Sequence, residues 1–331
     1  MFFTYISFFP SLLSGPIDRA KTFIPQLEKK RIFDYNQATD GLRQILWGLF
    51  KKVVIADNCA AITSPLFDNY QYFPASSLLL SIFLYTIQFY ADFSGYADMA
   101  IGFSHLLGFN ITKNFNYPFF AQNIAEFWQR WHISLTSWMT EYVFTPLTFI
   151  FRSSGRAGLI LAILINFVLV GLWHGANWTF IVFGLVQGCY FIPLILSGAL
   201  NKKKTIAKNK ILPTFREFIN IAGTFTFIML TTIIFRSETI WQAYQYYCSF
   251  FSISLFSIPV MPIGTLKTSL VLIMFVFVML GVEWLQRGKE HGLQMDHFKY
   301  PVFKPLIYCT LAFVVFLFGA TTADQFIYFE F

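Results

Sequence analysis

Charged side chains are scarce in this sequence of 331 residues. Asp, Glu, Lys and Arg together make up 12% of it, whereas soluble globular domains carry about 25%. Hydrophobic residues make up 56%, among them 43 Phe and 16 Tyr, which suit lipid contact and the membrane interface. A chain with so few charges cannot cover a globular surface with polar groups. The composition therefore excludes a soluble protein and predicts an all-α, multi-pass integral membrane protein in contact with the lipid bilayer.

Motifs for several common chemistries are also missing. The four cysteines form no CxxC pair, and no histidine stands at metal-ligand spacing, so we expect no metal site. The sequence has no GxSxG elbow, P-loop, dinucleotide-binding glycine pattern or HExxH motif. These absences exclude the usual serine-hydrolase, nucleotide-binding and zinc-protease sites, and we expect no tightly bound cofactor.

The net charge of +7 does not indicate nucleic-acid binding, because the basic residues lie in short loops between apolar runs. The positive-inside rule makes the strongest basic cluster cytoplasmic, namely Lys202, Lys203, Lys204, Lys208 and Lys210. Alternating spans then place residues 236–267 outside, the basic loop around Arg287 inside and the C-terminus outside. The turn at residues 174–177 falls toward the outer side, and Arg152 and Arg156 toward the inner side.

Several apolar runs approach the length of about 20 residues that a membrane-spanning helix needs. The clearest are residues 157–173, 178–196, 218–235, 269–285 and 306–319. A longer stretch at 76–107 contains Asp92, Gly95 and Asp98, which predicts one span that breaks into a second segment. We find no internal repeat and predict a single membrane-embedded domain over residues 1–331.

Two further stretches are amphipathic. At 124–151, apolar residues recur at helical spacing, which predicts one helix with Asn123 as its N-cap, packed in a bundle or lying in the interface. In the second stretch, the apolar residues share one face of a helix and the basic residues lie outside that face. This pattern predicts a helix lying flat on the cytoplasmic surface. Its apolar face comprises Leu42, Ile45, Leu46, Leu49 and Val53, and its basic residues are Arg43, Lys51 and Lys52.

Asp92 and Asp98 interrupt an apolar region, and carboxylates at membrane depth must pair, take up a proton or face water. Because they stand six residues apart, they would not share one face of a helix, so each would serve a different partner. Pairing with Arg or Lys is the interpretation we favour. A path for protons or cations is the alternative.

Five histidines could carry chemistry. His291 and His297 lie in a polar, basic loop and are predicted to be solvated, and His105 is predicted to be a buried histidine with its hydrogen bonds satisfied. His174 follows a long apolar run in LWHGANW, where an ionisable side chain is a candidate for function. His132, in EFWQRWHISLTSW, lies at the rim of the apolar face and could point into a polar cavity between helices.

Both of these histidines also have a structural interpretation. His174 could simply cap the C-terminus of a helix, where the helix dipole favours a cation, and His132 could hydrogen-bond a neighbouring carbonyl. With no nucleophile motif present, the chemistry that fits a histidine is general-base catalysis. The imidazole would take a proton from a hydroxyl that attacks a preformed thioester, and its pKa near neutrality suits that role.

Six elements of the sequence, taken in order, resemble the bacterial branch of the membrane-bound O-acyltransferase (MBOAT) family. That branch includes alginate O-acetyltransferases and the D-alanyl transfer protein of teichoic acid modification. The elements are FFPSLLSGPIDR (8–19), QFYADFSGYADMAIG (88–102), NFNYPF (114–119), FWQRWHISLTSW (127–138), LWHG (172–175) and FIYFEF (326–331).

The resemblance implies a ring of tilted helices around a thin centre, with His174 as the catalytic histidine and His132 as a second implicated one. It implies a thioester donor entering from the cytoplasm, either acyl-coenzyme A or an acyl-carrier protein, and an acceptor hydroxyl approaching from the other side. Members of the family usually carry further hydrophobic helices before the first element. We therefore expect a chain that is short at its N-terminus.

Three functions follow as hypotheses. The leading one is an O-acyltransferase of the bacterial inner membrane that moves an acyl group, with acetyl favoured, to an exported polysaccharide or to an extracytoplasmic acyltransferase partner. His174 would be the base, and His132 would position or polarise the donor carbonyl. The alternatives are a proton-coupled transporter or flippase that depends on Asp92 or Asp98, and an inactive truncated scaffold.

Overall fold

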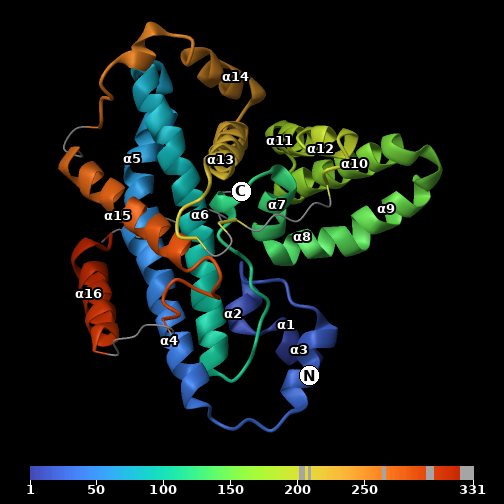
Figure 1. The fold of residues 1–331 in the computed structure, drawn as a ribbon, viewed down its shortest axis with the longest axis vertical. Coiled ribbons are helices and arrows are strands. Elements are labelled where there is room, and N and C mark those ends of the chain that lie inside the picture. Colours follow the sequence, from blue (N-terminus) through green and yellow to red (C-terminus); the bar gives the residue numbers. More distant parts are fainter. Residues whose placement is uncertain (201–205, 208–209, 263–265, 296–301, 321–331) are drawn as a thin grey trace. The chain divides into compact units, whose positions relative to one another are not determined.

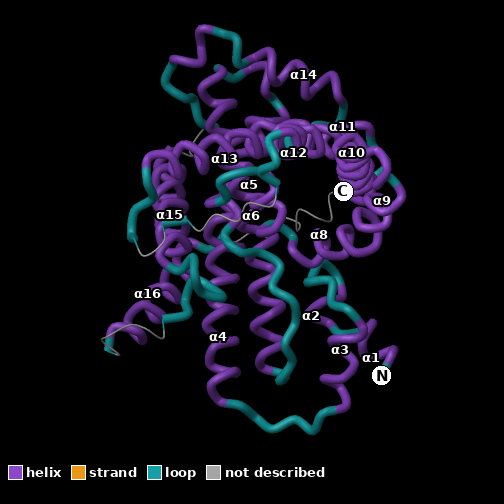
Figure 2. The backbone as a smooth tube through the Cα atoms, turned by 45° about the vertical axis from the view of Figure 1, so that its right-hand side comes forward, coloured by secondary structure: helices purple, strands orange, loops and turns teal. Residues whose placement is uncertain are grey.

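The computed structural model describes residues 1–200, 206–207, 210–262, 266–295 and 302–320. Every regular element in these ranges is a helix (Figure 2), which confirms the all-α prediction. Four helical stretches are long and apolar enough to cross a membrane, namely Ala75–Leu106, Arg152–His174, Trp178–Leu196 and Phe215–Arg236. Two shorter apolar helices, Ser269–Leu285 and Phe303–Phe318, coincide with the last two predicted runs.

The helices fall into two compact units, each of which is described by itself. Unit 1 comprises residues 1–65, 87–116 and the described part of 261–320. It contains α1 (Phe2–Ile6), α2 (Phe9–Leu12), α3 (Ala20–Glu28), α4 (Tyr35–Leu49), a π-helical segment (Phe50–Ala56), most of α5 (Asp57–Asp68), the second part of α6 (Ala75–Leu106), α15 (Leu266–Leu285) and α16 (Phe303–Phe318).

The predicted break in the 76–107 stretch is wrong, because α6 is one helix of 32 residues. Gly95 does not act as a hinge. A Cβ atom placed on it would lie 2.8 Å from the backbone oxygen of Gly48 in α4, which runs beside α6 (Figure 1). Gly95 therefore serves a close approach of two helix backbones, the packing mode that small residues permit in membranes.

The carboxylates of α6 are neutralised by two lysines of the π-helical segment. Lys51 Nζ lies 2.5 Å from Asp98 Oδ2, and Lys52 Nζ lies 2.8 Å from Asp92 Oδ1. The predicted pairing of the two aspartates with different basic partners is thus confirmed. Because each buried charge has an opposite charge beside it, the helix can continue through this region.

The second amphipathic stretch packs against α6 and does not lie free on a surface. Its buried side carries Gly41, Gly48 and Lys51, and Lys51 is 2% exposed. Leu42, on the face predicted to be apolar, is 55% exposed. The error arose because the buried side also includes Gln44 and Lys51, whose partner Asp98 lies elsewhere in the sequence.

Two histidines of unit 1 depart from their predicted surroundings. His291 is buried, with its Nε2 3.0 Å from Asp40 Oδ1 and its Nδ1 accepting the N–H of Leu293, so the prediction that it is solvated is wrong. His105 is only half-buried, and its Nδ1 has no hydrogen-bond partner among the described residues. His297, the cluster of lysines at 202–208 and the FIYFEF element lie outside the described residues.

Unit 2 comprises residues 66–86 and 117–260. Its main helices are the first part of α6, α7 (Ile124–Arg130), α8 (Ile133–Met139), α9 (Thr145–Ile150), α10 (Gly155–His174), α11 (Trp178–Cys189), α12 (Ile192–Leu196), α13 (Phe215–Arg236) and α14 (Ile240–Ser249). Single turns of 3₁₀-helix lie at Tyr70–Tyr72, Pro118–Phe120, Arg152–Ser154 and Ile253–Phe256, and a π-helical turn lies at Thr140–Phe144.

Glycines bring α10 and α11 into backbone contact. A Cβ atom on Gly171 would lie 2.1 Å from the backbone oxygen of Phe180, and one on Gly184 would lie 2.1 Å from that of Phe167. No larger residue fits at either position without moving a backbone. The two helices therefore pack as an antiparallel pair (Figure 1), and this pair holds the region around His174.

Candidate functional site

His174 is the last residue of α10, at the start of a three-residue turn to α11. Gly175 is needed there, because a Cβ atom would lie 2.8 Å from the ring of Phe180. Asn177 caps α11 by accepting the N–H of Thr179, and its amide donates to the backbone oxygen of Glu238 at 3.0 Å. The LWHGANW motif thus forms a turn that is held by the hydrogen bonds of Asn177, and this turn fixes the position of the imidazole.

Aromatic rings surround the imidazole of His174. Its ring centroid lies 4.9 Å from that of Trp173, 5.0 Å from that of Phe235 and 6.2 Å from that of Phe180. Phe235 and Phe180 are buried, whereas His174 itself is half-buried. The ring is held in a largely apolar setting, and the residue keeps part of its surface exposed.

His132 lies at a break that the sequence did not predict. The stretch 124–151 is not one helix. α7 ends at Arg130 and α8 begins at Ile133, with His132 between them in the left-handed conformation at φ 43°, ψ 54°. Asn123 caps α7 as predicted, by accepting the N–H of Glu126. A left-handed conformation costs a residue other than glycine about 1–3 kcal/mol, although histidine tolerates it better than most.

The break brings the two candidate histidines together. The ring of His132 lies 5.8 Å from that of Trp173, which also contacts His174, so one indole touches both imidazoles. His132 is 3% exposed. Burial, and secondarily the charge of nearby His174, lowers the pKa of His132 far below its usual value. His132 is therefore neutral at physiological pH and can donate or accept a hydrogen bond.

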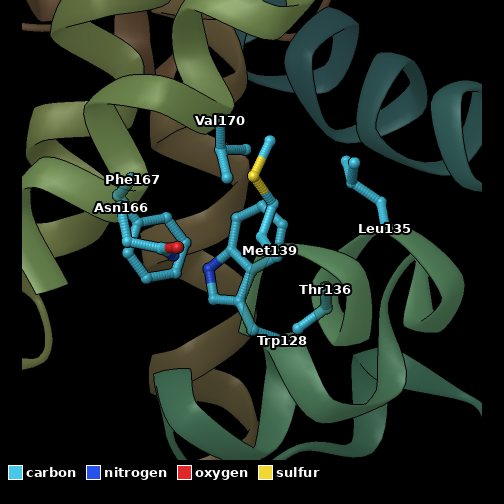
Figure 3. Close-up of a pocket in the computed structure, with 7 residues that line it drawn as sticks. All are labelled: Trp128, Leu135, Thr136, Met139, Asn166, Phe167 and Val170. Atoms are coloured by element: carbon cyan, nitrogen blue, oxygen red, sulfur yellow. The ribbon is translucent and has the colours of Figure 1, made fainter. Parts of the chain in front are cut away.

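A small cavity lies between α7–α8 and α10 (Figure 3). Its volume is about 20 Å³, enough for about one water molecule. It is lined by Trp128, Leu135, Thr136, Met139, Asn166, Phe167 and Val170. The only polar groups among these side chains are those of Trp128, Thr136 and Asn166.

Two of these three polar side chains bond within the protein. The indole N–H of Trp128 donates to Gln187 at 3.2 Å, and the Gln187 amide donates in turn to Thr231 at 2.8 Å. The hydroxyl of Thr136 donates to the backbone oxygen of Trp131 at 3.1 Å. The Oδ1 atom of Asn166 has no partner among the residues that the structure describes.

The sequence predictions missed Asn166 and Trp173. Asn166 is the only amide side chain in the apolar run 157–173. A polar side chain in such a run is the signal that could have indicated it. Trp173 gave no signal, because tryptophan is common at membrane interfaces. Over the described ranges, no group of three His, Cys, Asp or Glu side chains is placed to hold a metal ion.

The arrangement provides a neutral imidazole at a helix break and a second, more accessible imidazole at a helix end. The half-buried His174 can exchange a proton with a bound group, whereas the buried, neutral His132 can donate or accept a hydrogen bond. Such a site suits proton transfer to or from a hydroxyl.

Comparison with known proteins gives several matches. The chain is 35% identical over 255 residues to a probable alginate O-acetylase of Azotobacter vinelandii, covering 76% of this chain and 48% of that protein. It is 36% identical over 245 residues to a peptidoglycan O-acetyltransferase of Helicobacter pylori, covering 72% and 44%. A teichoic acid D-alanyltransferase of Streptococcus thermophilus is 30% identical over 263 residues, covering 71% and 60%.

The chain thus spans about half the length of the curated relatives it matches. The sequence model of the membrane-bound O-acyltransferase family matches residues 1–237, which include both histidines and the cavity. The match also covers the close helix pair α10 and α11 and the apolar helices up to α13. The chain therefore belongs to the membrane-bound O-acyltransferase family.

Proposed function

We propose that this protein is a membrane O-acyltransferase that moves a short acyl group, with acetyl favoured, from a thioester to a hydroxyl. The observation that carries the proposal is the contact of both His132 and His174 with Trp173, at 5.8 Å and 4.9 Å between ring centroids. The two histidines come from separate helical segments, and they are the two that the family resemblance implicates in acyl transfer.

In this proposal His174 is the general base. Its imidazole takes the proton of the acceptor hydroxyl as the oxygen attacks the thioester carbonyl carbon. A C–O bond forms, the C–S bond breaks, and the departing thiolate receives the proton from the imidazolium. His132 stays neutral and positions or polarises the donor carbonyl, a role that its buried setting supports.

The location of the reaction follows from the expected topology. We propose that the chain lies in a bacterial inner membrane with the His174 turn toward the outer side and the C-terminus outside. The donor, a coenzyme A or carrier-protein thioester, would enter from the cytoplasm. The acceptor would be an exported polysaccharide, or an extracytoplasmic acyltransferase would relay the group. The names of the relatives, which refer to alginate, peptidoglycan and teichoic acid, support a cell-surface polymer.

The test is a transfer assay with the chain reconstituted in lipid nanodiscs. Free thiol released from acetyl-coenzyme A or from an acetyl-carrier protein is measured with alginate, peptidoglycan or teichoic acid as acceptor. We expect His174→Ala to lose at least about a hundredfold in transfer while expression and membrane insertion stay normal. His105→Ala, which alters a half-buried histidine of unit 1, is the matched control and should keep its activity.

Two outcomes would overturn the proposal. If His174→Ala transfers acetyl as fast as the wild type, the imidazole is not the base. If no acceptor supports thiol release by the wild type, the chain is an inactive scaffold. The transporter alternative predicts instead that flux depends on Asp92 or Asp98, whose pairing with Lys52 and Lys51 favours a structural role.

A further inference from the structure

Helix α14 folds back along α13 after a short turn. Its N-cap, Thr239, stands three residues after the end of α13 and accepts the N–H of Gln242 at 3.1 Å. The hydroxyl of Tyr247 donates to the backbone oxygen of Leu230 at 2.7 Å. Leu230 precedes Arg236, the last residue of α13, by six residues, or about 9 Å at 1.5 Å per residue. The far end of α14 thus lies beside the interior of a helix that is long and apolar enough to cross a membrane.

One face of α14 is buried and the opposite face is exposed. Tyr246 is buried, and its hydroxyl donates to the backbone oxygen of Leu78 in α6 at 2.9 Å. Trp241, Tyr244 and Cys248 are exposed, and their spacing of i, i+3 and i+7 places them on one side of the helix. The rings of Trp241 and Tyr244 stack at 5.3 Å between centroids. The outward face of α14 therefore consists of an indole, a phenol and a thiol, with no charge.

The segment 250–260, which follows α14, is also apolar on its outer side. Four of its large side chains are between 88% and 93% exposed, namely Phe251, Ile253, Phe256 and Ile258. Hydrogen bonds hold the backbone of this segment against the first turn of α6. The hydroxyl of Ser254 accepts the N–H of Ala75, and the hydroxyl of Ser77 bonds both backbone groups of Val260, at 2.7 Å and 2.8 Å. The segment is thus fixed with its apolar side chains pointing outward.

This surface has the chemistry of a lipid contact. No Asp, Glu, Lys or Arg occurs between Glu238 and Lys267. Trp and Tyr gather at the boundary between lipid and water, whereas docking surfaces for proteins carry a polar rim. Phe227 of α13 is exposed and stands three residues before Leu230, which Tyr247 contacts. The exposed face of α14 therefore continues the exposed apolar side of a helix that can span the bilayer.

We infer that α14 and the segment 250–260 enter the membrane leaflet on the side of the His174 turn, without crossing it, and that their exposed side chains contact lipid. The expected topology places these residues in water outside the membrane. Asn177 ties the two regions together, because its amide donates to the backbone oxygen of Glu238 at the start of this segment. The lipid-seated segment thus holds the His174 turn at the depth where α14 enters the leaflet.

The first test uses nanodiscs of phosphatidylcholine brominated on its acyl chains, which quenches indoles that lie in lipid. The fluorescence lost to bromine should fall in Trp241→Phe, because this variant removes an indole that contacts lipid. Trp47→Phe is the matched control, since it removes an indole that is buried inside unit 1. That variant should lose as much fluorescence to bromine as the wild type.

Cys248 provides a second probe on the same face. In a chain with Cys59→Ala, Cys189→Ser and Cys309→Ser, Cys248 is the sole thiol. A membrane-impermeant maleimide should leave it unlabelled in phosphatidylcholine nanodiscs and should label it after denaturation. The matched control carries Lys30→Cys as its sole thiol, at an exposed position between two other basic residues. That thiol should be labelled in the nanodiscs.

Three outcomes would overturn the inference. If Cys248 is labelled as fast as the thiol of Lys30→Cys, α14 faces water and is a surface for a soluble partner. If Trp241→Phe loses as much fluorescence to bromine as the wild type, Trp241 does not contact lipid. Protection of Cys248 without quenching of Trp241 would assign this face to a second copy of the chain. None of these readouts requires acyl transfer, so the inference and the proposed function can fail separately.

Discussion

The backbones of α10 and α11 touch at Gly171, so adding one methyl group there tests whether the contact positions the site. In Gly171→Ala, the new Cβ would lie 2.1 Å from the backbone oxygen of Phe180, more than 1 Å closer than the 3.4 Å at which ordinary contact begins. Backbone cannot yield as a flexible side chain does, so the two helices must separate. Overpacking of this kind costs about 1–3 kcal/mol.

The same displacement acts directly on the candidate histidine. Gly171 precedes His174 by three residues, and Phe180 contacts the ring of His174. A shift of about 1 Å in a catalytic group can cost about a hundredfold in rate. We therefore expect Gly171→Ala to lower the melting temperature in detergent and to lower thiol release about a hundredfold.

Gly223→Ala is the matched control, because Gly223 lies in α13 and a methyl group added to it would meet no atom within 4 Å. Replacing a helical glycine with alanine there should be neutral or should stabilise by up to about 1 kcal/mol. Melting temperature and thiol release are measured for both variants in the same detergent. Equal stability and equal activity of the two variants would refute the close backbone contact.

Two other predictions concern buried charge. Lys51→Met leaves Asp98 without its cation and should destabilise unit 1 by about 3–5 kcal/mol. Adding Asp98→Asn to this variant removes the unpaired charge and should restore much of the melting temperature. A double variant as unstable as Lys51→Met would contradict the pairing. Because burial lowers the pKa of His132, the folded state disfavours its protonated form, so stability should fall as the pH drops below about 6.5. Asparagine tolerates the left-handed conformation, so His132→Asn should lose less melting temperature than the wild type between about pH 7.5 and pH 5. An equal loss in both proteins would show that protonation of His132 does not contribute to the loss of stability at low pH.

Much of unit 2 could be predicted from local sequence. The apolar runs indicated the long helices, and Asn123 indicated the start of α7, because capping depends on a residue and its near neighbours. The break at His132 could not be predicted, because no glycine or proline marks it. The left-handed conformation is held by packing around Trp131 and by the bonds of Thr136 across the break.

In unit 1 the errors share one physical cause. Asp92, Asp98 and Gly95 suggest a broken helix when only their own segment is considered. Their partners Lys51, Lys52 and Gly48 lie about 40 or more residues away along the chain, and only the folded structure brings them together. His291 was misjudged for the same reason, because its partner Asp40 is 251 residues distant.

The three-residue turn between α10 and α11 has a consequence for how the chain is made. Two apolar helices joined so tightly, and meeting at glycines, can enter the lipid as a hairpin soon after Cys189 leaves the ribosome. His174 then lies at the tip of this hairpin, already against Phe180, before α13 has left the ribosome. Phe235, which belongs to α13, then completes the aromatic wall around the imidazole.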